Sequence, residues 1–310
     1  MDSSDFFLAG WRVRSHFSLP ELLPWAGDPH QSVDLLISAA EGVPDVPSQL
    51  VFDNHVSQVA PDRSCWVTLP GIARFFIHSD ATQIHVAAYR GDPAAPAVRL
   101  FLLSTVLAIV CHRRGLLPMH ASCVEIGGRA VLFTGPTCAG KSLLAAAFLR
   151  AGCRVLSDDI AVLNVAAPTG PAVLPSFPRL RLWRSALNEL GFSLEDLRRS
   201  RPELEKYDIS TENAFIAQPR PLTAMYHLRR WRKGIEVTTT RLYAARAMRD
   251  AAQAVYCAQP GRALDPEPAS TQRIAGLCSG ASSHILYCKP GLDSISAIIT
   301  NLLQEHNHHL

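Results

Sequence analysis

The sequence predicts an α/β protein in which a smaller β-rich domain precedes a larger domain with a phosphate-binding loop. Residues 135–142 read GPTCAGKS and match the pattern G-x-x-x-x-G-K-[ST], with an apolar strand before them and an apolar helix after them. By contrast, short alternating segments separated by proline, glycine and aspartate fill the first part of the chain. We therefore expect a β-rich domain over residues 1–95, a connecting helix over 96–114 and a phosphate-binding domain over 115–310.

Length and composition set the broad class. A chain of 310 residues exceeds the usual size of a single hydrophobic core, which supports two domains. A formal net charge of +3 is too small to indicate nucleic acid or a membrane surface as a partner. The longest apolar run, residues 100–111, is too short to span a bilayer, and the N-terminus lacks a basic segment followed by an apolar one. The expected localisation is the cytoplasm.

The 8 cysteines show neither C-x-x-C pairs nor the cysteine and histidine spacing of a zinc site. Several of them lie in apolar runs, where a free thiol packs as a small hydrophobic group. Cys138 lies inside the phosphate-binding loop, where it is either a spacer or an oxidisable thiol.

Four segments of the β-rich domain alternate between apolar and polar residues or are rich in aromatic and β-branched ones. We expect strands over residues 11–14, 65–69, 73–78 and 83–86. Residues 93–112 then predict a largely buried helix, which basic residues and Gly115 end in the manner of a helix C-terminus.

In the second domain, the strands expected over residues 121–126 and 130–134 flank Gly127-Gly128, which indicates a hairpin. The phosphate-binding loop follows, and residues 143–150 predict the helix after it. A further strand over residues 154–157 ends at two aspartates. Ligands of open α/β sheets bind at the carboxyl ends of strands, so this is a favourable position for acidic site residues.

Later elements are predicted from local pattern alone. Short helices are expected over residues 185–190 and 193–200, and a strand pair over residues 222–228 and 235–240 around a turn at Lys233-Gly234. The last helix is expected to have one apolar face at helical spacing, formed by Ile295, Ile298, Ile299, Leu302 and Leu303.

The loop supplies the expected nucleotide contacts through backbone N–H groups and the positive end of the following helix. Its candidate nucleotide-binding residues are Gly135, Pro136, Thr137, Cys138, Ala139, Gly140, Lys141 and Ser142. The Lys141 ammonium can reach the β- and γ-phosphates, and the Ser142 hydroxyl can hold Mg²⁺. A nucleoside triphosphate with Mg²⁺ is therefore the expected ligand.

Phosphoryl transfer also needs a group that positions or deprotonates the nucleophile. Asp158 and Asp159 follow the strand after the loop helix, and either both act at the site or one only caps a turn. His120 precedes the neighbouring strand, although a lone histidine is more often structural than catalytic. Arg179 and Arg181 are candidate contacts to a phosphate or a peptide carboxylate. The basic residues 229–233 fit a solvated hairpin end better than a site.

The run from His120 through GPTCAGKS to Ser157-Asp158-Asp159-Ile160 resembles the bacterial HPr kinase/phosphorylase family. That family transfers phosphate from a nucleotide to a protein serine. The resemblance implies that Asp158 is the base, that Asp159 and His120 are its partners, and that Ser142 and Asp159 hold Mg²⁺.

The resemblance covers about residues 115–165. Leu143 stands where the family has a glutamate, and the family's later glycine-rich stretch has no clear counterpart. Both departures argue against phosphorylase activity.

A closer likeness is to HPr-kinase-like lasso-peptide precursor kinases, through residues 8–13, 99–103 and 174–183. It implies an ATP- and Mg²⁺-dependent kinase with an HPr-kinase-like fold that phosphorylates a serine hydroxyl near the C-terminus of a ribosomal precursor peptide. The expected partner is a peptide or small protein. The family's hexamers leave a homo-oligomer open.

Two other functions stay open at this point. A small-metabolite kinase would use the same loop, and a nucleotide-gated peptide-binding module would bind ATP without turnover. The combination of Lys141, Ser142 and the two aspartates favours catalysis, because a pure sensor needs no base.

Overall fold

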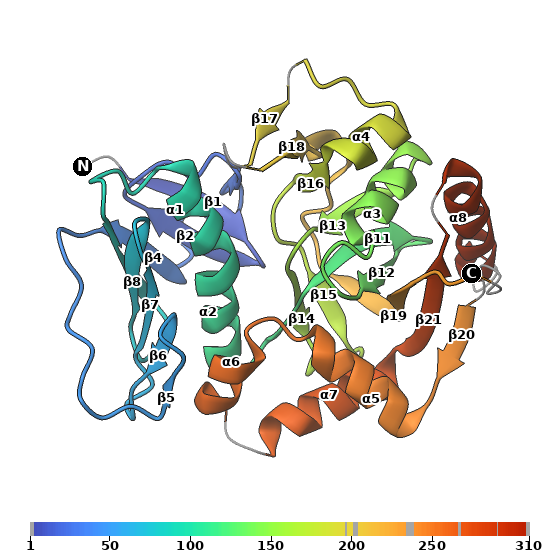
Figure 1. Cartoon of the computed structure of the whole chain (residues 1–310). Coiled ribbons are helices and arrows are strands. Elements are labelled where there is room, and N and C mark those ends of the chain that lie inside the picture. The colour runs from blue at the N-terminus through green and yellow to red at the C-terminus, as the bar shows by residue number, and fades with distance from the viewer. Residues whose placement is uncertain are drawn as a thin grey trace. The chain divides into compact units, whose positions relative to one another are not determined.

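The computed structural model describes residues 3–195, 197–200, 204–233, 239–265, 268–289 and 291–307. The chain divides into two compact units, whose elements Figure 1 labels. Unit 1 comprises Met1–Pro118 and Tyr256–Thr271, and unit 2 comprises Met119–Val255 and Gln272–Leu310. This division differs from the expected one in two respects. The helix expected as a connector over 96–114 is part of unit 1, and the chain returns to unit 1 at residues 256–271.

Unit 1 is built on a sheet whose nine strands, among the described residues, run in the order β3-β1-β2-β4-β9-β8-β7-β6-β5. The strands are β1 Ser4–Leu8, β2 Trp11–Ser15, β3 Leu23–Pro24, β4 Leu35–Ala39, β5 Phe52–Asp53, β6 Ser57–Val59, β7 Cys65–Leu69, β8 Ala73–Ile77 and β9 Gln83–Ala88. All four strands expected in this part of the sequence are confirmed as β2, β7, β8 and β9.

The apolar helix of unit 1 also matches its prediction. It runs as α1 Pro96–Phe101, a π-helical turn over Leu102–Val106 and α2 Leu107–Arg113. By length and composition this helix could cross a membrane, yet 56% of it is buried inside the protein, and the core helix of a soluble protein passes the same test. Its burial explains why it belongs to unit 1 and does not act as a linker.

Helix α6 Ala258–Leu264 joins unit 1 from far along the chain. The His112 ring nitrogen Nε2 donates a hydrogen bond to the Tyr256 carbonyl at 2.8 Å. Gly261 lies so close to the His112 ring that a Cβ atom there would come within 2.6 Å of it. The returning segment is therefore packed tightly against α2.

Unit 2 is a mixed sheet. Strands β11 Ala121–Ile126 and β12 Arg129–Thr134 form the expected hairpin, and β13 Arg154–Ser157 pairs with β11. On the other side, β12 lies parallel to β19 Arg220–Arg230, and β19 lies parallel to β21 Ser282–Cys288. Further strands are β10 Leu117–Met119, β14 Ala161–Asn164, β15 Ala172–Leu174 and β20 Thr239–Leu242.

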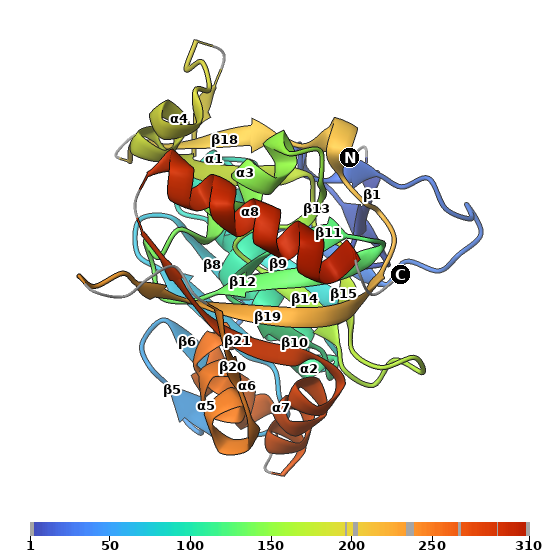
Figure 2. The same cartoon turned by 90° about the vertical axis from the view of Figure 1, so that its right-hand side faces the viewer.

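Two pairs of helices flank this sheet. Helices α3 Lys141–Arg150 and α8 Leu292–Asn307 cover one face, and α5 Ala244–Ala254 and α7 Ala269–Gly280 lie on the other (Figure 2). Under α3, the rings of Phe133 and Phe148 stack with their centres 5.4 Å apart. The predicted apolar face of the last helix is confirmed, since Ile298 and Leu302 are fully buried.

A small sheet and a short helix lie above α3 in both views (Figures 1 and 2). The sheet contains β16 Arg179–Trp183, β18 Lys206–Ser210 and β17 Arg198–Arg199, and α4 Arg184–Leu190 follows β16. A 3₁₀ turn lies at Glu212–Ala214. The helix expected over residues 193–200 is wrong for its described part, because Arg198 and Arg199 pair with β18 and gain its backbone hydrogen bonds instead.

Of the strand pair expected around Lys233-Gly234, the first strand, residues 222–228, is confirmed within β19. The expected pairing is wrong for the described residues 239–240 of the second strand. Residues 234–238 lie outside the described part of the chain. Strand β20 pairs with β21 and not with β19, because both edges of β19 are already taken by β12 and β21.

Candidate nucleotide site

The phosphate-binding loop joins β12 to α3, so the predicted strand, loop and helix are confirmed. Gly135 has φ +137°, and a Cβ atom there would lie 2.8 Å from the Leu228 carbonyl oxygen of β19. Gly140 has φ +98° and immediately precedes α3. The glycines therefore let the loop lie against β19 and turn into the helix, whose free N–H groups form an anion-binding end.

The side chain of Lys141 lies along the loop. Its ammonium donates hydrogen bonds to the carbonyls of Gly135 and Pro136, at 2.9 and 3.1 Å. Burial lowers the pKa of this ammonium. The ammonium of Lys141 is thus hydrogen-bonded to two carbonyl oxygens of the loop. Phosphate oxygens could accept the same hydrogen bonds, which fits a contact from Lys141 to the β- or γ-phosphate.

Asp158 is buried behind the loop, with 3% of its surface exposed. Its Oδ1 atom accepts hydrogen bonds from the hydroxyls of Ser122 and Ser142, at 2.5 and 2.9 Å. Its Oδ2 atom accepts one from the Arg181 backbone N–H at 2.8 Å. The carboxylate is fixed from three directions and is placed directly against the loop serine.

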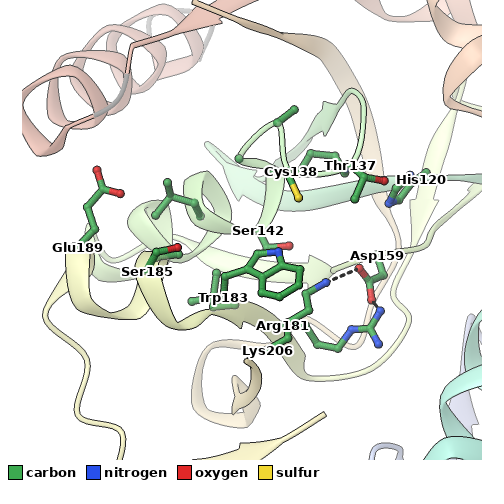
Figure 3. A pocket seen from close by; sticks show the side chains of 16 residues that line it. His120, Thr137, Cys138, Ser142, Asp159, Arg181, Trp183, Ser185, Glu189 and Lys206 are labelled. Carbon is green, nitrogen blue, oxygen red and sulfur yellow. Dashed lines mark ion pairs between the residues drawn. The ribbon is translucent and has the colours of Figure 1, made fainter. Parts of the chain in front are cut away.

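The neighbouring Asp159 faces a different set of groups, because its backbone turns into the left-handed region at φ 67°. Its carboxylate forms ion pairs with the Arg181 guanidinium and, at 3.8 Å, with the Lys206 ammonium (Figure 3). The two adjacent aspartates therefore separate: Asp158 turns to Ser142, and Asp159 turns to two cations.

Asp159 opens onto a cavity of about 400 Å³ beside the loop (Figure 3). It is lined by His120, Thr137, Cys138, Ala139, Gly140, Lys141, Ser142, Leu143, Asp159, Arg181, Leu182, Trp183, Ser185, Ala186, Glu189 and Lys206. Burial, helped by the nearby Lys141 ammonium, lowers the pKa of His120 to about 4. The His120 ring is therefore neutral at pH 7 and can donate or accept a hydrogen bond in this cavity.

Most of the residues predicted for the site meet in this cavity. Arg179 does not line it. Its guanidinium is paired with Asp208 at 3.5 Å and lies over the Phe177 ring at 5.0 Å. Arg181 is two residues further along the same strand, which brings it to Asp159.

Sequence reasoning missed two polar contributors and one aromatic residue. Ser122 is an inward-facing residue of β11 that no motif marks, and Trp183 ends β16. His227, in β19, lies beside the loop strand, and its Nδ1 atom is 2.7 Å from the Thr134 hydroxyl oxygen. Trp183 and His227 come from elements distant from the loop in the sequence, and Ser122 reaches Asp158 because β11 pairs with β13.

His227 faces a second cavity of about 380 Å³, which His120, Pro136, Thr137 and Asp250 also line. Within the described residues, its buried Nε2 atom has no hydrogen-bond partner. Burial lowers the pKa of His227 to about 4. Two neutral histidines therefore flank the first half of the loop.

The fold is an α/β unit in which a glycine-containing loop joins a strand to a helix beside two adjacent aspartates with different partners. No family model matches the chain, and no curated protein does. Among solved structures, it is similar to the Hpr(Ser) kinase/phosphatase from Coxiella burnetii. The match has 12% identity and a TM-score of 0.32, and it covers 62% of this chain and 97% of the other. A likeness this distant transfers no residue roles.

Proposed function

We propose that this chain is an ATP- and Mg²⁺-dependent kinase that transfers the γ-phosphate to a serine hydroxyl of a peptide or small protein. The observation that carries the proposal is the separation of the two aspartates, one against the loop serine at 2.9 Å and one on the wall of the adjoining cavity. Phosphoryl transfer needs this division between the nucleotide side and the acceptor side. The finer identity of the acceptor, a lasso-type precursor peptide, rests on the sequence resemblance alone.

The residues at the loop serine suit a magnesium ion. Ser142 Oγ and Asp158 Oδ1 are hard oxygen donors 2.9 Å apart, the ligand type that Mg²⁺ prefers. A magnesium ion held there would supply positive charge that neutralises the charge of the phosphates. We assign the magnesium site to Ser142 and Asp158 in preference to Ser142 and Asp159, because the Asp159 carboxylate forms ion pairs with Arg181 and Lys206.

We call the cavity beside the loop, which Asp159 lines, the acceptor cavity, and we assign the proton-accepting role to Asp159. Its carboxylate lines the cavity, whereas Asp158 is buried with both oxygens already hydrogen-bonded. The acceptor hydroxyl would lose its proton to the Asp159 carboxylate as its oxygen attacks the γ-phosphorus, and the bond between that phosphorus and the departing ADP oxygen would break. Arg181 and Lys206 would hold the carboxylate in place, and neutral His120 would hydrogen-bond the transferred phosphoryl group. This reverses the roles that the resemblance implies for the two aspartates.

The kinase proposal is tested by intact-mass analysis of serine-containing peptides after incubation with ATP and Mg²⁺, including any precursor peptide encoded next to this gene. A gain of one phosphate group on a serine is expected with the native protein and not with Lys141→Ala. ATP binding without transfer to any peptide would instead favour a metabolite kinase or a nucleotide-gated binder, which assays with free hydroxyl metabolites would separate.

The two aspartates are tested against each other in the same assay. Asp159→Asn should lower kcat by about 10²–10⁴-fold, the usual contribution of a general base, with ATP affinity retained. Asp158→Asn should instead weaken the Mg²⁺ dependence of ATP binding, measured by titration calorimetry with and without the ion. Normal turnover in Asp159→Asn together with a kcat loss confined to Asp158→Asn would contradict the proposal and support Asp158 as the base, as the sequence resemblance implies.

A further inference from the structure

Three parallel strands of unit 2 end at the same edge of the sheet. The pairs Thr134 with His227 and Arg230 with Cys288 show that the carboxyl ends of β12, β19 and β21 lie in adjacent positions. The phosphate-binding loop follows β12, and Trp231 follows β19. Ligands of open α/β sheets bind in the crevice outside such strand ends. The loop and Trp231 therefore lie at the same edge of the sheet, where a ligand could contact both.

A cavity of about 350 Å³ occupies this edge. Loop residues 138–140 and Leu143 line one side of it, and Trp231, Lys289 and Ile298 line others. The Lys289 ammonium lies 5.6 Å from the centre of the Trp231 ring. An indole ring, aliphatic side chains and a nearby cation suit a flat aromatic ligand that carries hydrogen-bonding groups at its rim.

This cavity and the acceptor cavity lie on two sides of the same loop, because both are lined by residues 138–140 and Leu143. Their chemistry differs. The acceptor cavity contains Asp159 with its two cations, whereas the cavity beside Trp231 combines the indole ring and aliphatic residues with the charged side chains of Glu189, Arg229, Arg230 and Lys289. In a triphosphate bound on the loop, the γ-phosphate must face the acceptor. The opposite end of the molecule then leads away from Asp159.

We propose that the cavity between the loop and Trp231 binds the base of the nucleotide, with the base stacked on the indole ring. This inference rests on the proposed nucleotide-dependent function, and it adds to that function the position at which the base of the nucleotide binds. The rival site is the acceptor cavity, where Trp183 is 38% exposed. The two tryptophans therefore offer a matched pair of variants.

The test compares ATP with inorganic tripolyphosphate, which has the phosphates but no base, by titration calorimetry of the full chain with Mg²⁺. Stacking of a base on an aromatic side chain contributes about 1–3 kcal/mol, which corresponds to roughly 5- to 150-fold in affinity. Trp231→Ala should lower ATP affinity by about this factor and leave tripolyphosphate affinity unchanged. Retained tripolyphosphate binding also shows that the variant is folded. Trp231→Phe should keep most of the ATP affinity, since a smaller ring still stacks.

Trp183→Ala is the matched control and should leave ATP affinity unchanged. The proposal is overturned if Trp183→Ala weakens ATP binding and Trp231→Ala does not, because the base would then lie in the acceptor cavity. It is also overturned if the native protein binds tripolyphosphate as tightly as ATP. If the native protein binds neither compound, the nucleotide-dependent function fails and the base site fails with it. ATP binding without kinase activity would leave the base site standing while the kinase function fails.

Discussion

The conformation of Gly135 makes the loop intolerant of any side chain. Its φ of +137° is unfavourable for other residues, and an added Cβ atom would meet the backbone oxygen of Leu228 at 2.8 Å, which cannot swing aside. Gly135→Ala should therefore destabilise the protein by about 2–6 kcal/mol, as the sum of backbone strain and the clash. Urea unfolding measures the effect.

Gly152→Ala is the control for backbone strain alone. Gly152 has φ +89°, but a Cβ atom at this residue would have no neighbour within 4 Å. This substitution should cost about 1–2 kcal/mol. Equal losses in the two variants would mean that the close approach of the loop to β19 is not what excludes a side chain from position 135.

His120 and His227 make the stability of the folded protein depend on pH. Burial lowers the pKa of each to about 4 in the folded protein, from 6.5 in an unfolded chain. Between pH 6.5 and pH 4, the unfolded chain binds more protons than the folded protein. The free energy of unfolding is therefore highest above pH 6.5 and decreases as the pH falls toward 4.

From pH 7 to pH 5, the free energy of unfolding should therefore fall by about 2 kcal/mol for each of the two histidines. Urea unfolding at the two pH values measures this fall. His120→Gln should remove its share of the fall, whatever it does to catalysis. An unchanged pH dependence in that variant would show that His120 does not titrate with a lowered pKa.

At the same scale, the sequence indicated which residues lie together better than it indicated the contacts that each of them makes. Lys141, Ser142 and the aspartate pair follow from a motif and its spacing, and the structure brings them together with His120 and Arg181. The division between Asp158 and Asp159 depends on the positive φ of Asp159 and on Ser122 and Lys206, which come from two other strands. A short sequence pattern cannot predict contacts between residues of separate strands.

Among the elements, helix α8 offers a direct test of the packing on its face of the sheet. Leu302 is 1% exposed and Leu292, at the first turn of the same helix, is 50% exposed. Leu302→Ala should destabilise the protein by about 2–5 kcal/mol, because it leaves a cavity against α3 and the sheet. Leu292→Ala makes the same chemical change at an exposed position and should cost less than about 1 kcal/mol. Similar losses, measured by urea unfolding, would contradict the docking of α8.

The elements predicted correctly are those with a strong local period or a local turn, such as β7, β8, the β11–β12 hairpin and α8. The failures concern partner choice. Residues 198–199 have no apolar period of their own and become a strand because β18 offers an unpaired edge. Strand β20 pairs with β21 because β19 is already occupied on both sides. Competition for a sheet edge is a property of the assembled fold, which a window of sequence cannot contain.

At the scale of the whole molecule, the chain enters unit 1 twice and unit 2 twice. The fragment 1–118 lacks α6, which packs against His112 of α2, and the fragment 119–310 carries α6 without its packing partner. Neither fragment should give the stability of its unit in the full chain. Limited proteolysis of the separate fragments tests this, and protease resistance of fragment 1–118 equal to that of the full chain would contradict it.

The return of residues 256–271 to unit 1 has a consequence for synthesis. A ribosome makes Met1–Pro118 first and must then make all of Met119–Val255 before the segment that completes unit 1 emerges. At about 5–20 residues per second this takes roughly 7–30 s. During that interval the nascent chain exposes the surface of α2 that α6 later covers. Met1–Pro118 must therefore wait, incomplete, while Met119–Val255 is translated, and unit 2 in turn is complete only after Gln272–Leu310 has followed.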